Sequence, residues 1–147
     1  MNNIGSAIGA LTQANVIPAP VPPDYIRSLE AAVCAQLPKD YSLLLERFGA
    51  IDIPADVPIA VYDPAVICGY VASIYNMDGT IPSKWPALPI AKYDRFGDDI
   101  GYLRDGDQFG PSLVILDHEG PWTVENDYWH KPFANSFADL VADRYSA

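Results

Sequence analysis

Residues 37–51 read LPKDYSLLLERFGAI, and the periodicity of the chain changes at the end of this stretch. Before Gly49 the apolar residues recur every three or four positions, which indicates helices. After Gly49 come short runs of β-branched and aromatic residues broken by proline and glycine, which are typical of strands. Pro38 fits the first turn of a helix, and Gly49 fits the left-handed position that follows one. The stretch therefore predicts the junction between a helical front and a β-rich centre.

The same periodicity predicts three helices. An apolar stripe indicates a helix over 24–36, after a cap at Asp24, and a second helix follows over 38–48. The third helix is expected near 136–145, where Ser136 with an acid three residues later forms a capping box.

Strands are expected between Gly49 and the last helix. They correspond to the runs AIDIP, PIAVYD, VICGYVASIY, ALPIAKYD, DDIGYLR (99–104 in its β part), SLVILDH (113–118 in its β part) and WTVEND, with DGDQFGP as a loop. The order of helices and strands predicts an α+β fold, a single domain in which the helices pack on one face of an antiparallel sheet. Residues 1–23, which include PAPVPP, form a proline-rich N-terminal extension, and the domain covers 24–147.

Charge limits the possible partners. The 147 residues carry a net charge of −10, and residues 93–147 hold most of it. Nucleic acid and anionic membranes would repel such a chain, so neither is expected as a partner, whereas a basic protein would be attracted. Cys34 and Cys68 have no paired spacing, no signal peptide is visible and no apolar run is long enough to span a bilayer. We therefore expect a cytoplasmic protein.

Acids are densest in residues 92–106, KYDRFGDDIGYLRDG, but their spacing does not suit a metal. A calcium loop needs oxygen ligands at its first, third and fifth positions, and loops starting at Asp94 or Asp105 place phenylalanine at one of these. His118 and His130 have no zinc-ligand spacing with each other or with the cysteines. We expect no structural zinc or calcium and no other cofactor.

Catalysis is not expected either. The triplet DHE at 117–119 combines acids with a histidine, but on a strand Asp117 and His118 would point to opposite faces. The chain contains no GxSxG, HExxH or phosphate-binding glycine loop. No catalytic residue is predicted, and the chain is expected not to be an enzyme.

Three segments resemble the SUKH superfamily, the immunity-protein fold related to the Smi/Knr cell-wall regulators. They are LPKDYSLLLERFGAI (37–51), LPIAKYDRFGDDIGYL (88–103) and FANSFADLVADRY (133–145). They occur in the family's order, and the resemblance covers 24–147. It implies the α+β fold and a role as an immunity protein. Such a protein binds tightly to a polymorphic toxin that is made beside it, and thereby neutralises the toxin. The family has no catalytic residues to transfer to this chain.

The acids and the aromatic segment NDYWHKP (126–132) then become candidates for the toxin-binding surface. Acids would speed association with a basic partner such as a nuclease, and a tryptophan is a favoured interface anchor. The residues expected on this surface are Asp98, Asp99, Asp105, Asp107, Asp127 and Trp129. Alternatively, the acids are only solvated turn residues that keep sheet edges from pairing. Two other functions remain open: a cytoplasmic regulatory or scaffold domain of the same fold, and a small hydrolase with an unrecognised site.

Overall fold

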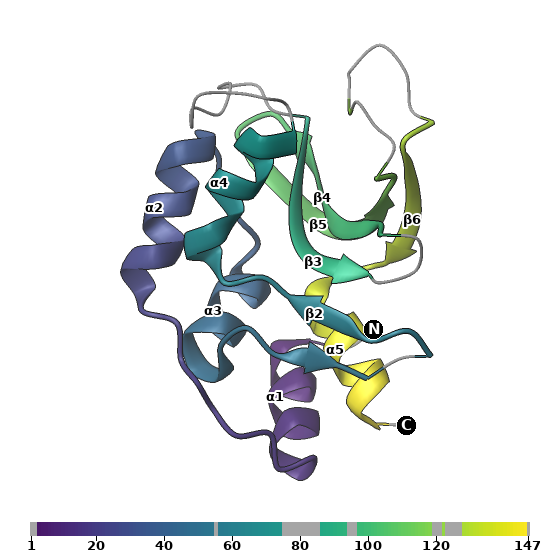
Figure 1. Ribbon diagram of the computed structural model, residues 1–147. Helices are drawn as coiled ribbons and strands as arrows, with labels where there is room; N and C mark the ends of the chain where they lie inside the picture. The colour runs from purple at the N-terminus through teal and green to yellow at the C-terminus, as the bar shows by residue number, and fades with distance from the viewer. Residues whose placement is uncertain are drawn as a thin grey trace.

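The computed structural model describes residues 3–54, 56–74, 86–93, 97–118, 122 and 128–146 (Figure 1). Its elements are α1 (Ile4–Gln13), α2 (Pro23–Val33), α3 (Lys39–Phe48), β1 (Asp52–Ile53), β2 (Ile59–Val61), α4 (Pro64–Ile74), β3 (Ala87–Tyr93), β4 (Asp99–Asp105), β5 (Gln108–Leu116), β6 (His130–Ala134) and α5 (Phe137–Ser146). The strands form one sheet in chain order, and each pairs antiparallel with its neighbour. The predicted single α+β domain with an antiparallel sheet is confirmed.

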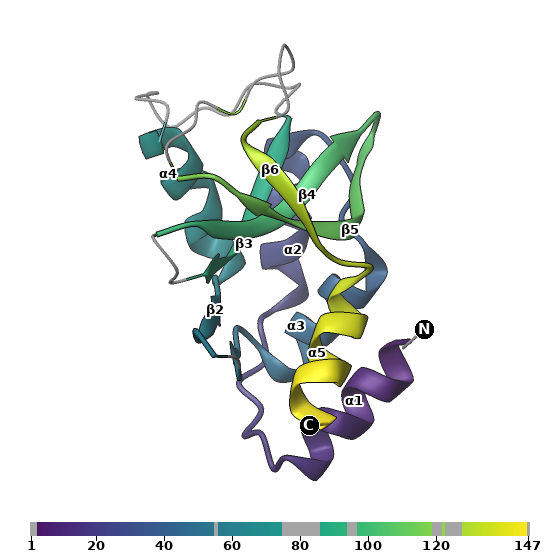
Figure 2. The same cartoon turned by 90° about the vertical axis from the view of Figure 1, so that its right-hand side faces the viewer.

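The helices contact the sheet at different places. Helix α4 packs beside α2 and against β3, while α5 contacts β1, β5 and β6 as well as α1 and α3. Both views show α1 and α5 side by side below strands β3 to β6 (Figures 1 and 2). That all the helices pack on one face of the sheet stays a prediction.

Helix α1 was not expected from the sequence, which indicated only a proline-rich extension over 1–23. The side chain of Asn3 accepts a hydrogen bond from the backbone N–H of Ser6 and caps the helix. Ala7 and Leu11, one helical turn apart, are fully buried where α1 packs on α5. Helix α1 therefore contributes to the hydrophobic core.

The proline-rich stretch after α1 is hydrogen-bonded along α3. The N–H of Ala19 donates to the carbonyl of Phe48, and the N–H of Val21 donates to the carbonyl of Leu45, both at 3.0 Å. Gly49 follows with φ 88° and ψ −167°, so the expected left-handed cap is wrong. This backbone region is essentially restricted to glycine. A Cβ at Gly49 would lie 1.9 Å from the carbonyl oxygen of Ala19, so the close approach also requires glycine.

Helix α4 replaces the strand predicted for VICGYVASIY. Asp63 Oδ1 accepts a hydrogen bond from the N–H of Ala65 at 2.9 Å, and Pro64 opens the helix. Ile67 and Val71, one turn apart, are both fully buried. Capping and burial of one helical face therefore outweigh the β propensity of the branched residues in this run.

The later strands differ from the prediction in their ends. Strand β4 matches the expected 99–104, but β5 begins at Gln108 and so takes in most of the expected DGDQFGP loop. Strand β5 also ends at Leu116, before the expected end at 118. The last strand is β6, which was not predicted. Of the expected strand WTVEND, only Trp122 lies within the described residues.

The centre of the core joins α3, β4 and α5. The ring of Tyr41 makes edge contacts with the rings of Tyr102 and Phe137, at centroid distances of 6.0 and 5.5 Å. Asp40 Oδ2 accepts a hydrogen bond from the N–H of Ala138 at 2.9 Å, which ties the start of α3 to the start of α5. The hydroxyls of Tyr41 and Tyr102 are buried and have no hydrogen-bond partner among the described residues.

Candidate functional site

The start of β4 carries two adjacent acids in different surroundings. The turn before the strand contains Gly97, at φ 81°, followed by Asp98 and Asp99. Successive residues of an extended chain point in opposite directions, so the two carboxylates separate. The side chain of Asp98 is 22% exposed, whereas Asp99 is 2% exposed. The alternative interpretation, in which these acids are solvated turn residues, therefore does not hold for Asp99.

Asp99 joins α4 to the sheet. Its two carboxylate oxygens accept hydrogen bonds from the hydroxyls of Tyr62, just after β2, and Tyr70, in α4, each at 2.5 Å. The two phenol rings lie 5.3 Å apart between centroids. Because Asp99 is enclosed in this way, it cannot contribute an exposed charge to a partner surface, which corrects the sequence-based assignment. Its contacts indicate a structural role.

Burial dominates the electrostatics of this group. It raises the pKa of Asp99, and the charge of Asp98 raises it further, while the two phenol donors oppose the shift. Burial also raises the pKa of Tyr62 and of Tyr70, and their hydrogen bonds to the carboxylate add to the effect. Both phenols therefore stay protonated and able to donate throughout the neutral pH range.

Removing the Asp99 carboxylate should loosen α4. Asp99→Ala leaves two half-buried hydroxyls without their acceptor and should lower the free energy of unfolding by about 2 to 4 kcal/mol. Asp99→Asn keeps the shape and one acceptor, and should cost less.

The pH dependence of stability gives a second test. Because the pKa of Asp99 is raised in the folded protein, its contribution to stability is full below the pKa of the unfolded chain. That contribution is lost as the pH rises through the pKa of the folded protein. Denaturant melts should therefore show the Asn variant gaining on wild type from pH 4 to pH 7; a constant difference would contradict this.

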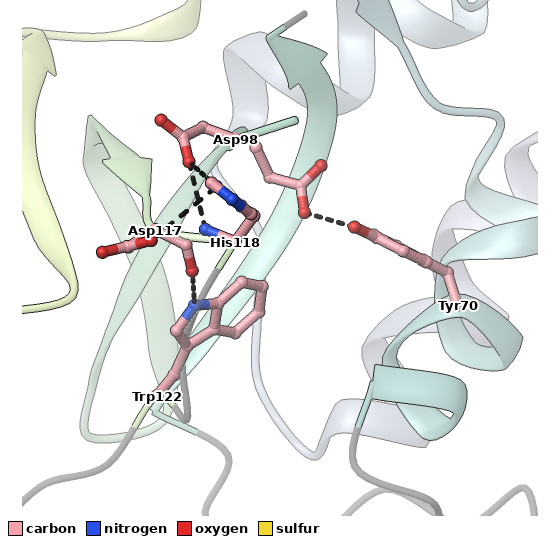
Figure 3. Close-up of polar contacts among 6 residues, drawn as sticks. Tyr70, Asp98, Asp117, His118 and Trp122 are labelled. Atoms are coloured by element: carbon pink, nitrogen blue, oxygen red, sulfur yellow. Dashed lines mark hydrogen bonds and ion pairs between the residues drawn. The ribbon is translucent and has the colours of Figure 1, made fainter. Parts of the chain in front are cut away.

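On the other side of β4, Asp98 lies with Asp117 and His118 (Figure 3). Asp98 Oδ1 is 2.7 Å from His118 Nδ1 and accepts the backbone N–H of His118 at 3.1 Å. His118 Nδ1 is 3.8 Å from Asp117 Oδ1. The expectation that Asp117 and His118 face opposite ways is wrong, because β5 ends at Leu116 and strand alternation no longer applies beyond it.

Two buried tryptophans hold Asp117 in place. The indole N–H of Trp122 donates to the carbonyl of Asp117 at 2.9 Å, and the N–H of Asp117 donates to the carbonyl of Trp129 at 2.7 Å. Trp129 is 6% exposed and belongs to the core, so the expectation that it serves as a surface anchor is corrected. Its neighbour Tyr128 is 87% exposed and is the aromatic that this segment presents to solvent.

The other predicted surface residues lie elsewhere. Asp105 and Asp107 are exposed at the β4–β5 turn, as the sequence indicated, but this is the far end of β4 from Asp98. A seven-residue strand spans about 20 Å, so these acids form a second, separate group. Asp127 lies outside the described residues. The six residues predicted to form one surface therefore do not form a single surface in the described part of the structure.

Comparison of the chain with protein-family models, curated proteins and solved structures gave no match. Among the helices in the described ranges, none has both the length and the apolar character needed to cross a bilayer. What this chain does must therefore be inferred from its own residues and fold.

Proposed function

We propose that this protein is a SUKH-like immunity protein of the bacterial cytoplasm, which neutralises a cognate toxin by stoichiometric binding and without catalysis. The observation that carries the proposal is the aromatic cluster of Tyr41, Tyr102 and Phe137. Each comes from a different one of the three segments that resemble the SUKH superfamily.

The cluster supports the proposal because it joins the three segments. Each segment by itself is a local pattern that many helices or hairpins would satisfy. Here, however, Tyr41, Tyr102 and Phe137 are all buried, and the ring of Tyr41 packs against the other two rings. Asp40, from the first segment, also bonds to the backbone at Ala138, in the third. The three segments that carry the resemblance therefore pack into one core in this chain, which supports the proposal.

The charge of the chain supports a basic partner. At a net charge of −10, the protein attracts a basic toxin such as a nuclease, and surface acids increase the rate of association. We assign binding to the end of the sheet that carries Asp98, Asp117 and Tyr128. This end combines acids with an exposed aromatic side chain, and tyrosine is enriched among interface hot spots.

Growth protection tests the proposal. The chain should be co-expressed in a bacterial host with the toxin encoded beside its gene. We expect wild type to restore growth and to co-purify with the toxin at a ratio of one to one. Failure to protect and to form a complex would reject a neutralising role. Turnover of a substrate by the purified protein would instead support the hydrolase alternative.

Binding kinetics test the assigned surface. Tyr128→Ala should speed dissociation and weaken binding roughly thirtyfold, the effect of about 2 kcal/mol at a hot spot. The double variant Asp98→Asn, Asp117→Asn should slow association and flatten its salt dependence. The matched control, Asp105→Asn with Asp107→Asn, removes the same charge at the far end of β4. Equal kinetics for the two double variants would show that this end of the sheet is not the binding surface.

A further inference from the structure

We propose that Asp98, Asp117 and His118 form a binding site for a divalent transition-metal ion of the Zn²⁺ class. One oxygen from each carboxylate and one imidazole nitrogen lie within 4.8 Å of one another. Figure 3 shows the three side chains converging between the start of β4 and the end of β5. The site shares Asp98 and Asp117 with the surface to which toxin binding is assigned, but metal binding itself does not require the immunity role. The site is not visible in the sequence, since twenty residues separate Asp98 from His118.

The distances fit a small ion. Around an ion with ligand bonds of about 2.0 to 2.2 Å, donors in neighbouring coordination positions lie about 3 to 3.5 Å apart. In the protein, the Nδ1 atom of His118 is 2.7 Å from Oδ1 of Asp98 and 3.8 Å from Oδ1 of Asp117. These separations lie on either side of the required range by a few tenths of an ångström. The 2.7 Å contact is a hydrogen bond, so a metal ion would replace it, and any proton on Nδ1 would leave to solvent. Small side-chain rotations would then bring all three donors onto one ion.

The donor set selects the class of metal. Imidazole nitrogen suits Zn²⁺ and other first-row transition ions, whereas Mg²⁺ and Ca²⁺ prefer oxygen donors throughout. Two carboxylates supply the charge to balance a divalent cation. The side chains of Asp117 and His118 are 47% and 42% exposed, so water can complete the coordination on the solvent side.

The surrounding structure holds the donors ready for an ion. The backbone of Asp117 is fixed on both sides by its bonds to Trp122 and Trp129, and both indoles are buried. Such support fixes the position of ligands before the metal arrives. A cation beside Asp98 would also offset the repulsion that this acid exerts on the buried carboxylate of Asp99.

Titration of the purified protein with Zn²⁺, measured by isothermal titration calorimetry, tests the site. We expect saturable binding of one Zn²⁺ per chain, and at least a tenfold loss of affinity in each of Asp98→Asn and His118→Gln. Two matched controls should bind as wild type does: His130→Gln, which removes the other histidine of the chain, and Asp105→Asn, which removes an acid at the far end of β4. Zn²⁺ should also raise the melting temperature of wild type and of the controls, but not of the site variants.

Three results would overturn the proposal: no saturable binding to wild type, equal affinity in wild type and His118→Gln, or equal loss in His130→Gln. Binding of Ca²⁺ more tightly than Zn²⁺ would overturn the assigned metal class. If His118→Gln does not fold, Asp98→Asn and Asp117→Asn, each checked by circular dichroism, decide the matter. The toxin is absent from this assay, so the site and the immunity role can fail separately.

Discussion

Tyr41→Ala is expected to lower the free energy of unfolding by about 3 to 5 kcal/mol, as for other large aromatic residues removed from a core. Tyr41 is fully buried, and its ring touches the rings of both Tyr102 and Phe137. Its loss would leave a cavity where α3, β4 and α5 meet. Chemical denaturation monitored by circular dichroism measures the effect.

Tyr41→Phe is the matched control and should behave in the opposite way. The Tyr41 hydroxyl is buried without a hydrogen-bond partner among the described residues. Phenylalanine keeps the ring contacts and removes the desolvation cost of that hydroxyl, which is about 1 to 3 kcal/mol for an unpaired buried group. We expect the variant to match or exceed wild type in stability. A loss of 1 kcal/mol or more, on the scale of one hydrogen bond, would show that the hydroxyl is bonded in solution.

Gly49→Ala is expected to destabilise the fold by about 3 kcal/mol or more, for two reasons that add. The backbone at Gly49 has φ 88°, which an alanine adopts only under strain, and the new Cβ would lie 1.9 Å from the carbonyl oxygen of Ala19. The stretch containing Ala19 would have to move, which would break its hydrogen bonds to α3. The same denaturation assay measures the loss.

Gly106→Ala separates the two causes. Gly106 also has a positive φ, of 61°, but an added Cβ there meets nothing within 4 Å. Its cost should be only the strain of the left-handed backbone, about 1 to 2 kcal/mol. Equal losses at Gly49 and Gly106 would show that the clash with Ala19 is relieved at little cost.

The sequence predicted the elements whose signals are local. The stripes over 24–36 and 38–48 became α2 and α3, and the capping box was found as Asp139 N–H bonded to Ser136 Oγ at 3.0 Å. The run VICGYVASIY (66–75) was predicted as a strand because its branched side chains favour strands locally, but its described part, 66–74, lies in α4. This helix depends on Asp63, which caps it, and on a buried face supplied by the rest of the fold.

The candidate site was harder to predict because it depends on long-range pairing. Strand alternation places the side chains of Asp98 and Asp99 on opposite faces, but it does not predict which of the two is buried. Asp99 is buried because helix α4 brings the hydroxyl of Tyr70 to its carboxylate. The approach of His118 to Asp98 requires the register of β4 on β5, which pairs Asp99 with Leu116. Trp129 and Tyr128 are adjacent and both aromatic, so the sequence could not show that only Tyr128 is exposed.

The packing of α1 on α5 has a consequence for synthesis on the ribosome. The apolar face of α1 is complete once Gln13 has been added, but its partner begins only at Phe137. At about 5 to 20 residues per second, the ribosome needs roughly 6 to 25 s to make the intervening chain. During that time α5 is absent, so Ala7 and Leu11 can be shielded from water only by other surfaces, such as another part of the chain or a chaperone. Native packing of α1 on α5 must therefore be a late event in synthesis, whatever order the strands between the two helices follow.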